Sequence, residues 1–486
     1  MGKALNGLKP EKLWNHFEEM CSIPHPSRNE AAIAAYVVEF AKKNNLEYAV
    51  DGFGNVLVKK PATKGKENLK TVVMQGHLDM VPEKNSDVKH DFDKDPIQCY
   101  ADGDWVRAKG TTLGADNGIG GAAALAVLES NDVEHGPIEV LFTLDEETGL
   151  NGAQALKPGF SSADILLNLD SEEDGAVYIG CAGGKNTYAK FPYKPENIKA
   201  GYETVKISVT GLMGGHSGLD IIQGRGNAVK IMARLLWQLK TGYPFQLVSY
   251  NGGSKHNAIP RETFAEIAVD KSNLDAAVKF INELGKTIAS EIKSVEKGLK
   301  IEAVKSAPAQ HAIESKTAMD LIDAVYAVPH GVIKMSADIE GLVETSTNMG
   351  VIVTEKDSVQ LITSQRSSVE SEKNDIADVV GNVFRMAGAE VTSGDGYPGW
   401  APDINSPVLK VMKNVYSSLY SKEPEVKAIH AGLECGIIKE RYPDMDMISF
   451  GPTIMGAHSP DERVQISTVE KFWNLLLNVL KNIPAK

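Results

Sequence analysis

Histidines and carboxylates occur at five places in this chain, several of them directly after apolar runs that predict buried strands. The groups are His77 with Asp79 in QGHLDM, Asp116 in TLGADNGIG, Glu146 with Glu147 in LDEETG, Asp170 in LLNLDSEE, and His458 in MGAHSPDE. In an open α/β sheet, ligands bind outside the carboxyl ends of the strands. Imidazole and carboxylate groups bind Zn²⁺, which takes about four to five ligands including water. The sequence therefore predicts a metal site with donors for two ions.

Each group taken alone also has a structural explanation. A histidine near a strand end is commonly a buried hydrogen-bonding residue, and Asp116, followed by Asn-Gly, suits a turn and a helix N-cap. The adjacent glutamates could occupy a solvated turn, and Asp170 could begin the acidic run DSEED. Strand and helix patterns alternate between residues 77 and 170, which would bring these groups to one rim. That coincidence favours the metal site.

The order of these motifs, with GGHSG between them, resembles the di-zinc metallopeptidase superfamily that includes carboxypeptidase G, peptidase T and carnosinase. Further stretches resemble the bacterial cytosolic non-specific dipeptidases, also called aminoacyl-histidine dipeptidases: SIPHPS, KHDFDKDPIQ, CAGG, NGG followed by HNAIPRE, GYPGW and HAGLECG. The resemblance runs over essentially the whole chain. It implies an α/β catalytic domain, with a central mostly parallel sheet flanked by helices, and an inserted α+β lid domain.

The resemblance also implies the metal ligands. His77 and Asp170 would bind one zinc ion, and a second ion would be bound by His458 and Glu147. Asp116 would bridge both ions, because a carboxylate has two oxygens and can hold cations about 3.5–4 Å apart. We thus expect two Zn²⁺ per chain, and Co²⁺ or Mn²⁺ would also suit these ligands.

The remaining catalytic roles follow from the same resemblance. Asp79 would orient His77 as a neighbouring carboxylate. Glu146 would be the general base: it would take a proton from a zinc-bridged water, whose pKa two ions lower toward about 7, and give it to the leaving amine. The tetrahedral oxyanion needs a further donor, and His216 in GGHSG is the candidate. Without the resemblance, this histidine would be an incidental part of a Gly-rich turn.

Three residues are candidates for holding the substrate. Arg366 follows the alternating strand VQLITSQ. It could bind the free C-terminus of a dipeptide through two parallel hydrogen bonds, although a surface salt bridge explains it equally well. Asn257, in HNAIP, would help at the same end, and Glu434, in AGLECG, would face the substrate's free amine. A site that binds both termini would exclude longer peptides, because a buried charged group left unpaired is costly.

Composition narrows the class of partner and the location. The chain has 51 basic and 64 acidic residues, and its net charge of −13 disfavours nucleic acid or an anionic membrane as a partner. It has no CxxC pair, so we expect reduced thiols, with no catalytic role for Cys181 or Cys435. There is no apolar segment typical of a signal peptide and no run of about 18 apolar residues. We therefore expect a cytoplasmic enzyme with a small-molecule dipeptide substrate.

Alternating strand and helix patterns predict an α/β sheet in the first part of the chain. Helices are expected at 10–21 and 28–44, strands around 46–60 and at 71–76, 138–144 and 164–169, and an irregular segment at 90–109. A capping box formed by Ser27 and Glu30 would open the second helix. Gly114 to Gly121 would lead into the apolar helix AAALAVLE.

The pattern changes after about residue 185. The amphipathic run NAVKIMARLLWQLK lies between two strand-like runs, YETVKISVTGLMGGHSG and TFAEIAVD. Helices are expected at 273–298, 316–326 and 369–387. A hairpin with the turn EKDS is expected at 343–366. This gives about two rounds of a β-α-β-β-like pattern without a clear sequence repeat.

These patterns predict three segments. A first catalytic part would span 1–185, an inserted lid 186–396, and a second catalytic part 397–486, because His458 must return to the metals. The long lid would either substitute for dimerisation or accompany a homodimer formed through it. Hinges are expected near Gly183-Gly184 and Gly394–Gly399, and lid closure would bring His216 to the metals.

Three functions are consistent with the sequence. The first is a metal-dependent dipeptidase with broad side-chain tolerance, including Xaa-His dipeptides such as carnosine. The second is a related di-zinc hydrolase acting on N-acyl-amino acids or tripeptides. The third is a metal-binding or scaffolding protein without catalysis, which is disfavoured because Glu146 is present and every expected ligand position is filled.

Overall fold

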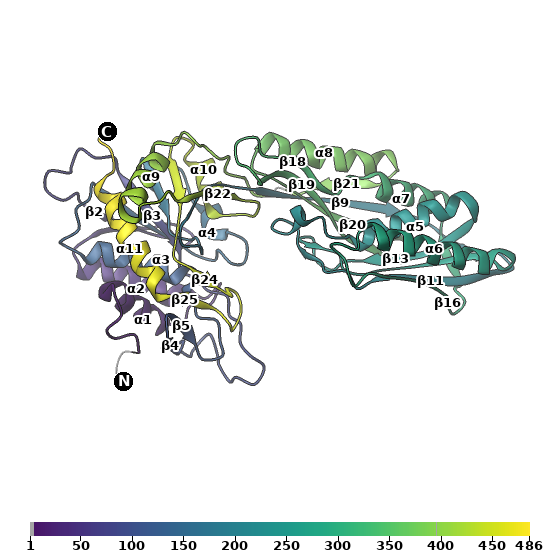
Figure 1. The fold of residues 1–486 in the computed structure, drawn as a ribbon, viewed down its shortest axis with the longest axis horizontal. Coiled ribbons are helices and arrows are strands. Elements are labelled where there is room, and N and C mark those ends of the chain that lie inside the picture. Colours follow the sequence, from purple (N-terminus) through teal and green to yellow (C-terminus); the bar gives the residue numbers. More distant parts are fainter. Residues whose placement is uncertain (1–3, 395) are drawn as a thin grey trace. The chain divides into compact units, whose positions relative to one another are not determined.

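The computed structural model describes residues 4–394 and 396–486, which divide into two compact units (Figure 1). Unit 1 comprises the chain up to Cys181, Trp400–Ala428 and Leu433–Lys486. Unit 2 comprises Ala182–Gly399 and Ile429–Gly432. None of the described helices is long and apolar enough to cross a membrane.

Unit 1 is built on an eight-stranded sheet of order β1-β2-β6-β3-β7-β23-β8-β22. Its strands are β1 (Glu47–Val50), β2 (Val56–Lys60), β3 (Val72–His77), β6 (Ile138–Thr143), β7 (Ile165–Asn168), β8 (Ala176–Cys181), β22 (Glu425–Ile429) and β23 (Asp446–Ser449). The central strands β6, β3, β7 and β23 are parallel, and β3, β6 and β7 are buried along their whole length. Continuous apolar runs are typical of parallel strands covered on both faces.

The α/β fold class predicted from the sequence is confirmed, but the sheet is more mixed than expected. Strands β1 and β2 pair antiparallel, as does β2 with β6 and β23 with β8. The short connection Asp51–Asn55 joins β1 to β2, and so short a loop can only return the chain antiparallel. Parallel pairing is therefore confined to the centre, where the ligand-bearing strands end.

Helices pack against this sheet and supply the rest of the core. They are α1 (Glu11–Cys21), α2 (Ala31–Lys43), α3 (Ala115–Glu129), α4 (Asn151–Ala155), α9 (Pro407–Tyr420), α10 (Glu434–Arg441) and α11 (Ile466–Lys481). Helix α3 contacts β3 and α1 and is buried on nearly all sides, which explains its run of Gly and Ala. Helix α11 is amphipathic and buries one apolar face, as expected for a helix at the surface of a core.

Two local predictions in unit 1 are wrong. Helix α2 begins at Ala31, and no capping box forms, because the Ser27 hydroxyl donates to Asp79 Oδ2 at 2.8 Å instead. The segment expected to be irregular contains an antiparallel hairpin of β4 (Cys99–Asp102) and β5 (Trp105–Ala108). Its turn centres on Gly103, which has a positive φ of 60°. Asp-Gly between short apolar runs is a recognised hairpin signal.

The hairpin belongs to a second, four-stranded sheet of order β24-β25-β5-β4. Strands β24 (Ile454–Met455) and β25 (Arg463–Gln465) pair antiparallel, and β25 pairs with β5. The connection between β24 and β25 carries His458. This small sheet therefore fixes the ends of the loop that returns to the other ligands.

Unit 2 contains a nine-stranded sheet of order β16-β11-β15-β13-β19-β20-β9-β21, with β18 beside β19. Its strands are β9 (Gly183–Pro192), β11 (Tyr202–Thr210), β13 (Phe245–Gly252), β15 (Thr263–Asp270), β16 (Lys300–Lys305), β18 (Gly331–Met335), β19 (Val343–Thr354), β20 (Ser358–Ser367) and β21 (Glu390–Ser393). These strands pair antiparallel with their neighbours. The predicted hairpin is confirmed by β19 and β20, which join at residues 355–357.

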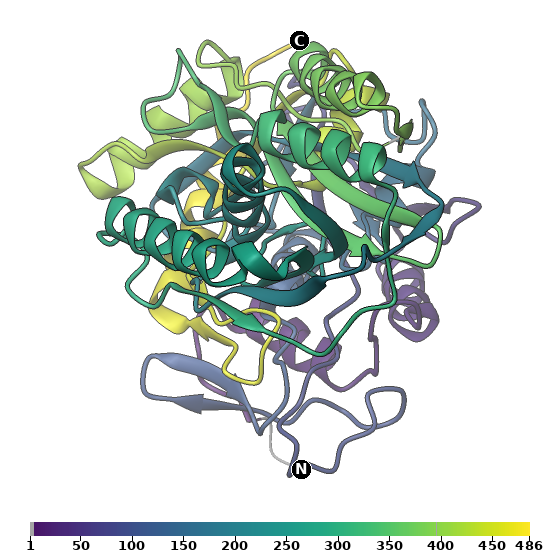
Figure 2. The same cartoon turned by 90° about the vertical axis from the view of Figure 1, so that its right-hand side faces the viewer.

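Four helices pack on the sheet of unit 2 and bury one large apolar core (Figure 2). They are α5 (Ala228–Gly242), α6 (Leu274–Glu291), α7 (Ser315–Ala327) and α8 (Glu370–Met386). Helix α6 is shorter than expected and ends at Glu291, ahead of the segment IKSVEKGLK. A two-stranded ladder of β12 (Gly215–His216) and β14 (Ala258–Ile259) forms a separate small sheet and carries His216.

Candidate functional site

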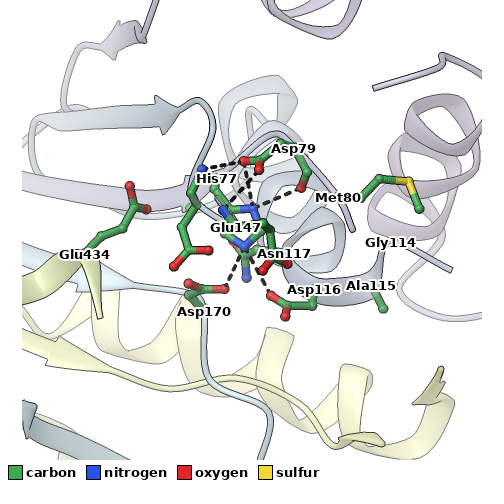
Figure 3. Close-up of polar contacts among 12 residues, drawn as sticks. His77, Asp79, Met80, Gly114, Ala115, Asp116, Asn117, Glu147, Asp170 and Glu434 are labelled. Atoms are coloured by element: carbon green, nitrogen blue, oxygen red, sulfur yellow. Dashed lines mark hydrogen bonds and ion pairs between the residues drawn. The ribbon is translucent and has the colours of Figure 1, made fainter. Parts of the chain in front are cut away.

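The predicted metal ligands of unit 1 lie together, and Figure 3 shows His77, Asp116, Glu147 and Asp170 close to one another. His77 is the last residue of β3, Glu146 and Glu147 follow β6, and Asp170 follows β7. Because these three strands are parallel neighbours, their ends reach the same edge of the sheet. Asp116 arrives from the first turn of α3 and His458 from the loop between β24 and β25.

Asp116 lies between the two histidines and presents one oxygen to each. His77 Nε2 is 3.1 Å from Asp116 Oδ1, and His458 Nε2 is 3.2 Å from Asp116 Oδ2. Asp170 Oδ1 is 3.5 Å from His77 Nε2, and Glu147 Oε2 is 3.0 Å from His458 Nε2. The ligand atoms thus form two groups that share Asp116.

The two groups fit divalent cations. Zinc–ligand bonds of about 2.0–2.1 Å place two ligands of a tetrahedral ion about 3.3–3.4 Å apart, close to the N···O distances found here. Glu147 Oε1 and Asp170 Oδ1 are buried and have no hydrogen-bond partner among the described residues. Buried carboxylate oxygens are normally satisfied, so a cation is the partner that this set of donors lacks.

Two backbone features make room for the Asp116 carboxylate between the two histidines. Asp116 has non-helical angles, φ −83° and ψ 105°, which turn it out of the first turn of α3. The next side chain, Asn117, donates to Leu169 O at 2.7 Å. It passes so close to Gly76 that a Cβ on Gly76 would lie 2.1 Å from Asn117 Oδ1. The glycine before His77 is therefore required for α3 to approach β3.

The charges of the two ligand groups shift the pKa values of their members. Although burial alone would lower it, the carboxylates of Asp170, Asp116 and Asp79 raise the pKa of His77 well above its usual range. Hydrogen bonds to Asp116 and Glu147 raise the pKa of His458 to about 11. Binding of cations must therefore displace protons from both imidazoles, which makes metal affinity pH-dependent.

Asp79 has a broader role in the fold than the sequence indicated. Its carboxylate lies 3.4 Å from His77 Nδ1, but the backbone oxygen of Asp79 is closer, at 3.0 Å. The carboxylate also accepts the backbone N–H groups of Glu146 and Glu147, at 2.9 and 3.2 Å. Burial opposes its ionisation, yet His77 and the Glu146 N–H lower the pKa of Asp79 to about 2. Asp79 therefore holds the glutamate turn as well as the histidine.

Two further carboxylates lie outside the two groups that share Asp116: Glu434 is buried, and Glu146 is half-buried and offers an oxygen within 4.8 Å of ligand atoms of His77 and Glu147. Burial, reinforced by the charges of Asp170, Glu434 and Glu147, raises the pKa of Glu146 well above its usual range. Glu434 accepts hydrogen bonds from Gln75 at 2.6 Å and Thr143 at 2.8 Å, while its Oε1 has no partner among the described residues. A nearby proton or cation would therefore stabilise both carboxylates.

In unit 2, the structure defines the hydrogen-bonding state of His216. The backbone N–H groups of Gly218 and Leu219 donate to His216 Nδ1 at 3.2 and 3.1 Å. Burial and the charge of Arg366 lower the pKa of His216 to about 4. A neutral imidazole whose Nδ1 accepts must carry its proton on Nε2. His216 therefore presents an N–H donor, and Asn257 adjoins it because Asn257 O accepts from Ser217 N at 2.9 Å.

Arg366 is buried, 7% exposed, near the end of β20. Its guanidinium donates to Tyr397 Oη at 2.9 Å, and no carboxylate in residues 4–394 or 396–486 forms an ion pair with it. Arg366 Nε also has no hydrogen-bond partner among those residues. A surface salt bridge is thus not the role of Arg366 in the described structure. A buried cation of this kind is suited to an anionic ligand, because leaving it uncompensated is costly.

Two residues near Arg366 were not singled out from the sequence. Tyr397, in GYPGW, accepts the Arg366 hydrogen bond, and His430, in HAGLECG, lies 2.7 Å from Ser346 Oγ through its Nε2. Both occur in motifs that the sequence marks only through the family resemblance. Their proximity to Arg366 depends on the pairing of β20 with β9 and β19, which local patterns do not give.

The four cysteines are free and buried, in agreement with the expectation of reduced thiols. Burial raises the pKa of Cys181 to about 11 and that of Cys435 well above its usual range. Such thiols are poor nucleophiles near neutral pH, because the thiolate is the reactive form.

Comparison with known proteins places this geometry in a family. The model of Peptidase family M20/M25/M40 matches residues 73–482. The chain is 46% identical over 482 residues to the cytosol non-specific dipeptidase of Escherichia coli strain K12, covering 99% of each protein. It is also 46% identical to the aminoacylhistidine dipeptidase of Vibrio alginolyticus, whose crystal structure superposes with a TM-score of 0.94, covering 99% of this chain and 98% of that one.

A more distant structure shares the fold alone. The aminopeptidase PepT of Bacillus cereus is 15% identical, with a TM-score of 0.58 and coverage of 98% and 99%. Peptidases of the M20 family are metal-dependent, and the resemblance predicted from the motifs is confirmed over the full length of the chain. The chain belongs to Peptidase family M20/M25/M40 and is a metallopeptidase.

Proposed function

We propose that this protein hydrolyses dipeptides with free N- and C-termini, with broad specificity that includes Xaa-His dipeptides such as carnosine, and that it uses two divalent cations, zinc foremost. The observation that carries the proposal is the position of Asp116, with one carboxylate oxygen facing His77 and the other facing His458. The substrate class is supported by the 46% identity to relatives named as a non-specific dipeptidase and an aminoacylhistidine dipeptidase.

In this proposal His77 and Asp170 hold one cation, His458 and Glu147 hold the other, and Asp116 bridges them. Cations bound there would supply an activated water molecule and polarise the peptide carbonyl.

Glu146 is the proposed general base. Its carboxylate takes up the proton of the attacking water and then releases it to the amine of the departing residue. The raised pKa of Glu146 suits a group that must hold a proton between these two steps. Asp79 keeps the turn that carries Glu146 in place by accepting the backbone N–H groups of both glutamates.

The proposed substrate contacts distinguish the two termini of a dipeptide. His216 donates its Nε2–H to the oxygen that becomes negative when the carbonyl is attacked. Arg366, assisted by Asn257, binds the C-terminal carboxylate as a two-pronged donor. Glu434 is the proposed counter-charge for the free amine, supported by its buried oxygen that has no partner among the described residues.

The test is hydrolysis of β-Ala-His, Ala-His, Ala-Ala-His and acetyl-His by the purified protein, before and after chelation and after zinc is restored. The proposal predicts cleavage of the two dipeptides only, lost on chelation and recovered with zinc. Cleavage of acetyl-His or of the tripeptide would instead identify a hydrolase of N-acyl-amino acids or tripeptides. No hydrolysis by metal-loaded protein would contradict the proposal and favour a binding role.

We expect a cytosolic location, because the relative from Escherichia coli is named a cytosol dipeptidase. A homodimer formed through unit 2 stays a prediction, and sedimentation of the purified protein would test it.

A further inference from the structure

One buried carboxylate beside the proposed metal ligands takes no part in the chemistry above. Glu462 lies in the motif GAHSPDE, four residues after His458, and is 2% exposed. None of the described basic side chains forms an ion pair with it. A buried carboxylate without an ionic partner must be satisfied by other donors.

The donors are four consecutive backbone N–H groups at the start of α3. Glu462 Oε2 accepts from Leu113 at 2.7 Å and from Gly114 at 3.0 Å. Glu462 Oε1 accepts from Ala115 at 2.7 Å and from Asp116 at 3.3 Å. The carboxylate therefore holds the backbone of the very segment that ends in the bridging ligand.

This segment needs an external acceptor. The first N–H groups of a helix have no partner within the helix. Here Gly114 is left-handed, with φ 73°, and Asp116 departs from helical angles, so the chain cannot satisfy these groups by itself. The two histidines contact the Asp116 carboxylate itself, whereas Glu462 accepts from the backbone N–H groups that set where this carboxylate begins.

Glu462 is also tied closely to His458. Glu462 N donates to Ser459 O at 3.0 Å, and Ser459 Oγ donates to Gly456 O at 2.6 Å, which closes a compact turn. His458 has a positive φ of 62° within this turn. Docking of Glu462 on α3 therefore also sets the position of His458, although Asp116 lies 342 residues earlier in the chain.

We propose that Glu462 is the positioning residue of the dinuclear site: by joining the His458 turn to the Leu113–Asp116 segment, it aligns the bridging carboxylate with both imidazoles before any cation binds. The inference rests on the proposed function, because it requires that Asp116 and His458 bind metal. Residues that orient metal ligands typically change metal affinity about 10–100-fold when they are substituted.

The competing explanation is that Glu462 is only a helix cap that stabilises unit 1. Glu139 provides a matched control. It is also 2% exposed and accepts hydrogen bonds from Ser161 Oγ at 2.6 Å, Ser162 Oγ at 2.6 Å and Ser162 N at 3.1 Å. It lies on β6, four residues before the end of the strand at Thr143. Its loss should destabilise unit 1 without touching the metal ligands.

The experiment compares wild type, Glu462→Gln, Glu462→Ala and Glu139→Ala. Zinc affinity is measured by competition with a chromophoric chelator, and the visible absorption spectrum of Co²⁺-loaded protein reports the ligand geometry. Thermal unfolding reports stability. We expect zinc affinity to fall about 10–100-fold in Glu462→Ala, with an altered Co²⁺ spectrum. Glu462→Gln, which keeps one acceptor oxygen, should fall between Glu462→Ala and wild type, and Glu139→Ala should change only the unfolding temperature.

The proposal is overturned if Glu462→Ala, or Glu462→Gln where the alanine variant does not fold, binds zinc with wild-type affinity and an unchanged Co²⁺ spectrum. Equal losses of zinc affinity in Glu462→Ala and Glu139→Ala would overturn it as well, since the effect would then come from general destabilisation. Failure of wild type to bind two cations would refute the proposed function itself. That result differs from both outcomes that overturn the role of Glu462, because it concerns the unsubstituted protein.

Discussion

The histidines of the two units have pKa values that are shifted in opposite directions. In unit 1, neighbouring carboxylates raise the pKa values of His77 and His458. In unit 2, burial and the charge of Arg366 lower the pKa of His216 to about 4 and that of His430 to about 3. Histidines among carboxylates are suited to hold cations, whereas neutral histidines beside a buried arginine are suited to donate hydrogen bonds to an anion. The chemistry of each histidine is therefore set by its neighbours.

This contrast predicts that substitutions in unit 1 alter metal binding or proton transfer, while substitutions in unit 2 alter the handling of substrate. The largest expected effect is that of Glu146→Gln. It should keep about two cations per chain but reduce kcat by about 10²–10⁴-fold, because it removes general base catalysis and no metal ligand. Metal analysis together with steady-state kinetics on Ala-His would measure both quantities.

Glu147→Gln is the matched control, since its side chain has the same length and lies at the next position. It should lose the cation that Glu147 is proposed to hold together with His458. Loss of metal in Glu146→Gln, with metal retained in Glu147→Gln, would mean that the roles of the two glutamates are reversed.

The next effect concerns His216, which should act without binding metal. His216→Ala should lower kcat by about 10²–10³-fold through loss of one oxyanion donor, with wild-type metal content. A group whose pKa is lowered to about 4 is neutral at all higher pH values. Its protonation should therefore reduce kcat/KM only as the pH falls toward about 4. Kinetics between pH 5 and 9 would test this, because a histidine with an unshifted pKa near 6.5 would titrate within that range and His216 should not.

His311→Ala, an exposed histidine of the same unit, serves as the control and should leave kcat unchanged. Loss of metal in His216→Ala, or a kcat that stays at the wild-type value, would contradict the role of His216 as a hydrogen-bond donor.

A smaller effect is expected for Arg366→Ala. Loss of charge-assisted hydrogen bonds worth about 1.5–3 kcal/mol should raise KM for a dipeptide about 10–150-fold. KM for the same dipeptide amidated at its C-terminus should change little, because the amide carries no charge. Arg366→Lys should recover only part of the affinity, since lysine lacks the planar fork.

Arg234, which forms an exposed ion pair with Glu291, provides a control in the same unit. Arg234→Ala should leave KM for both substrates unchanged. Equal rises in KM for the free and the amidated dipeptide in Arg366→Ala would remove the carboxylate-binding role.

That the candidate metal ligands come together could be predicted in large part, because several of them follow strands that the sequence marks clearly. The runs before His77, Asp145 and Asp170 are mostly apolar, and parallel neighbours must end at one edge. The place of His458 came from the family resemblance, since its loop lies in a distant part of the chain. The bridging geometry of Asp116 also depends on a local backbone distortion that no periodicity reveals.

The errors have physical causes of the same kind. Ser27 and Glu30 have capping-box spacing, but a tertiary partner, Asp79, takes the Ser27 hydroxyl. The hairpin at residues 99–108 is short and gains its stability by pairing with β25, more than 350 residues later, so its Asp-Gly turn was the only local signal. Glu462 and Tyr397 likewise gain their partners only through the fold.

The most direct test of the dinuclear account is a titration of chelated, metal-free protein with Zn²⁺ while Ala-His hydrolysis is followed. Two ligand groups that share Asp116 predict that activity rises until about two equivalents of zinc are bound per chain and then reaches a plateau. Full activity at one equivalent, or activity that persists without added metal, would contradict it.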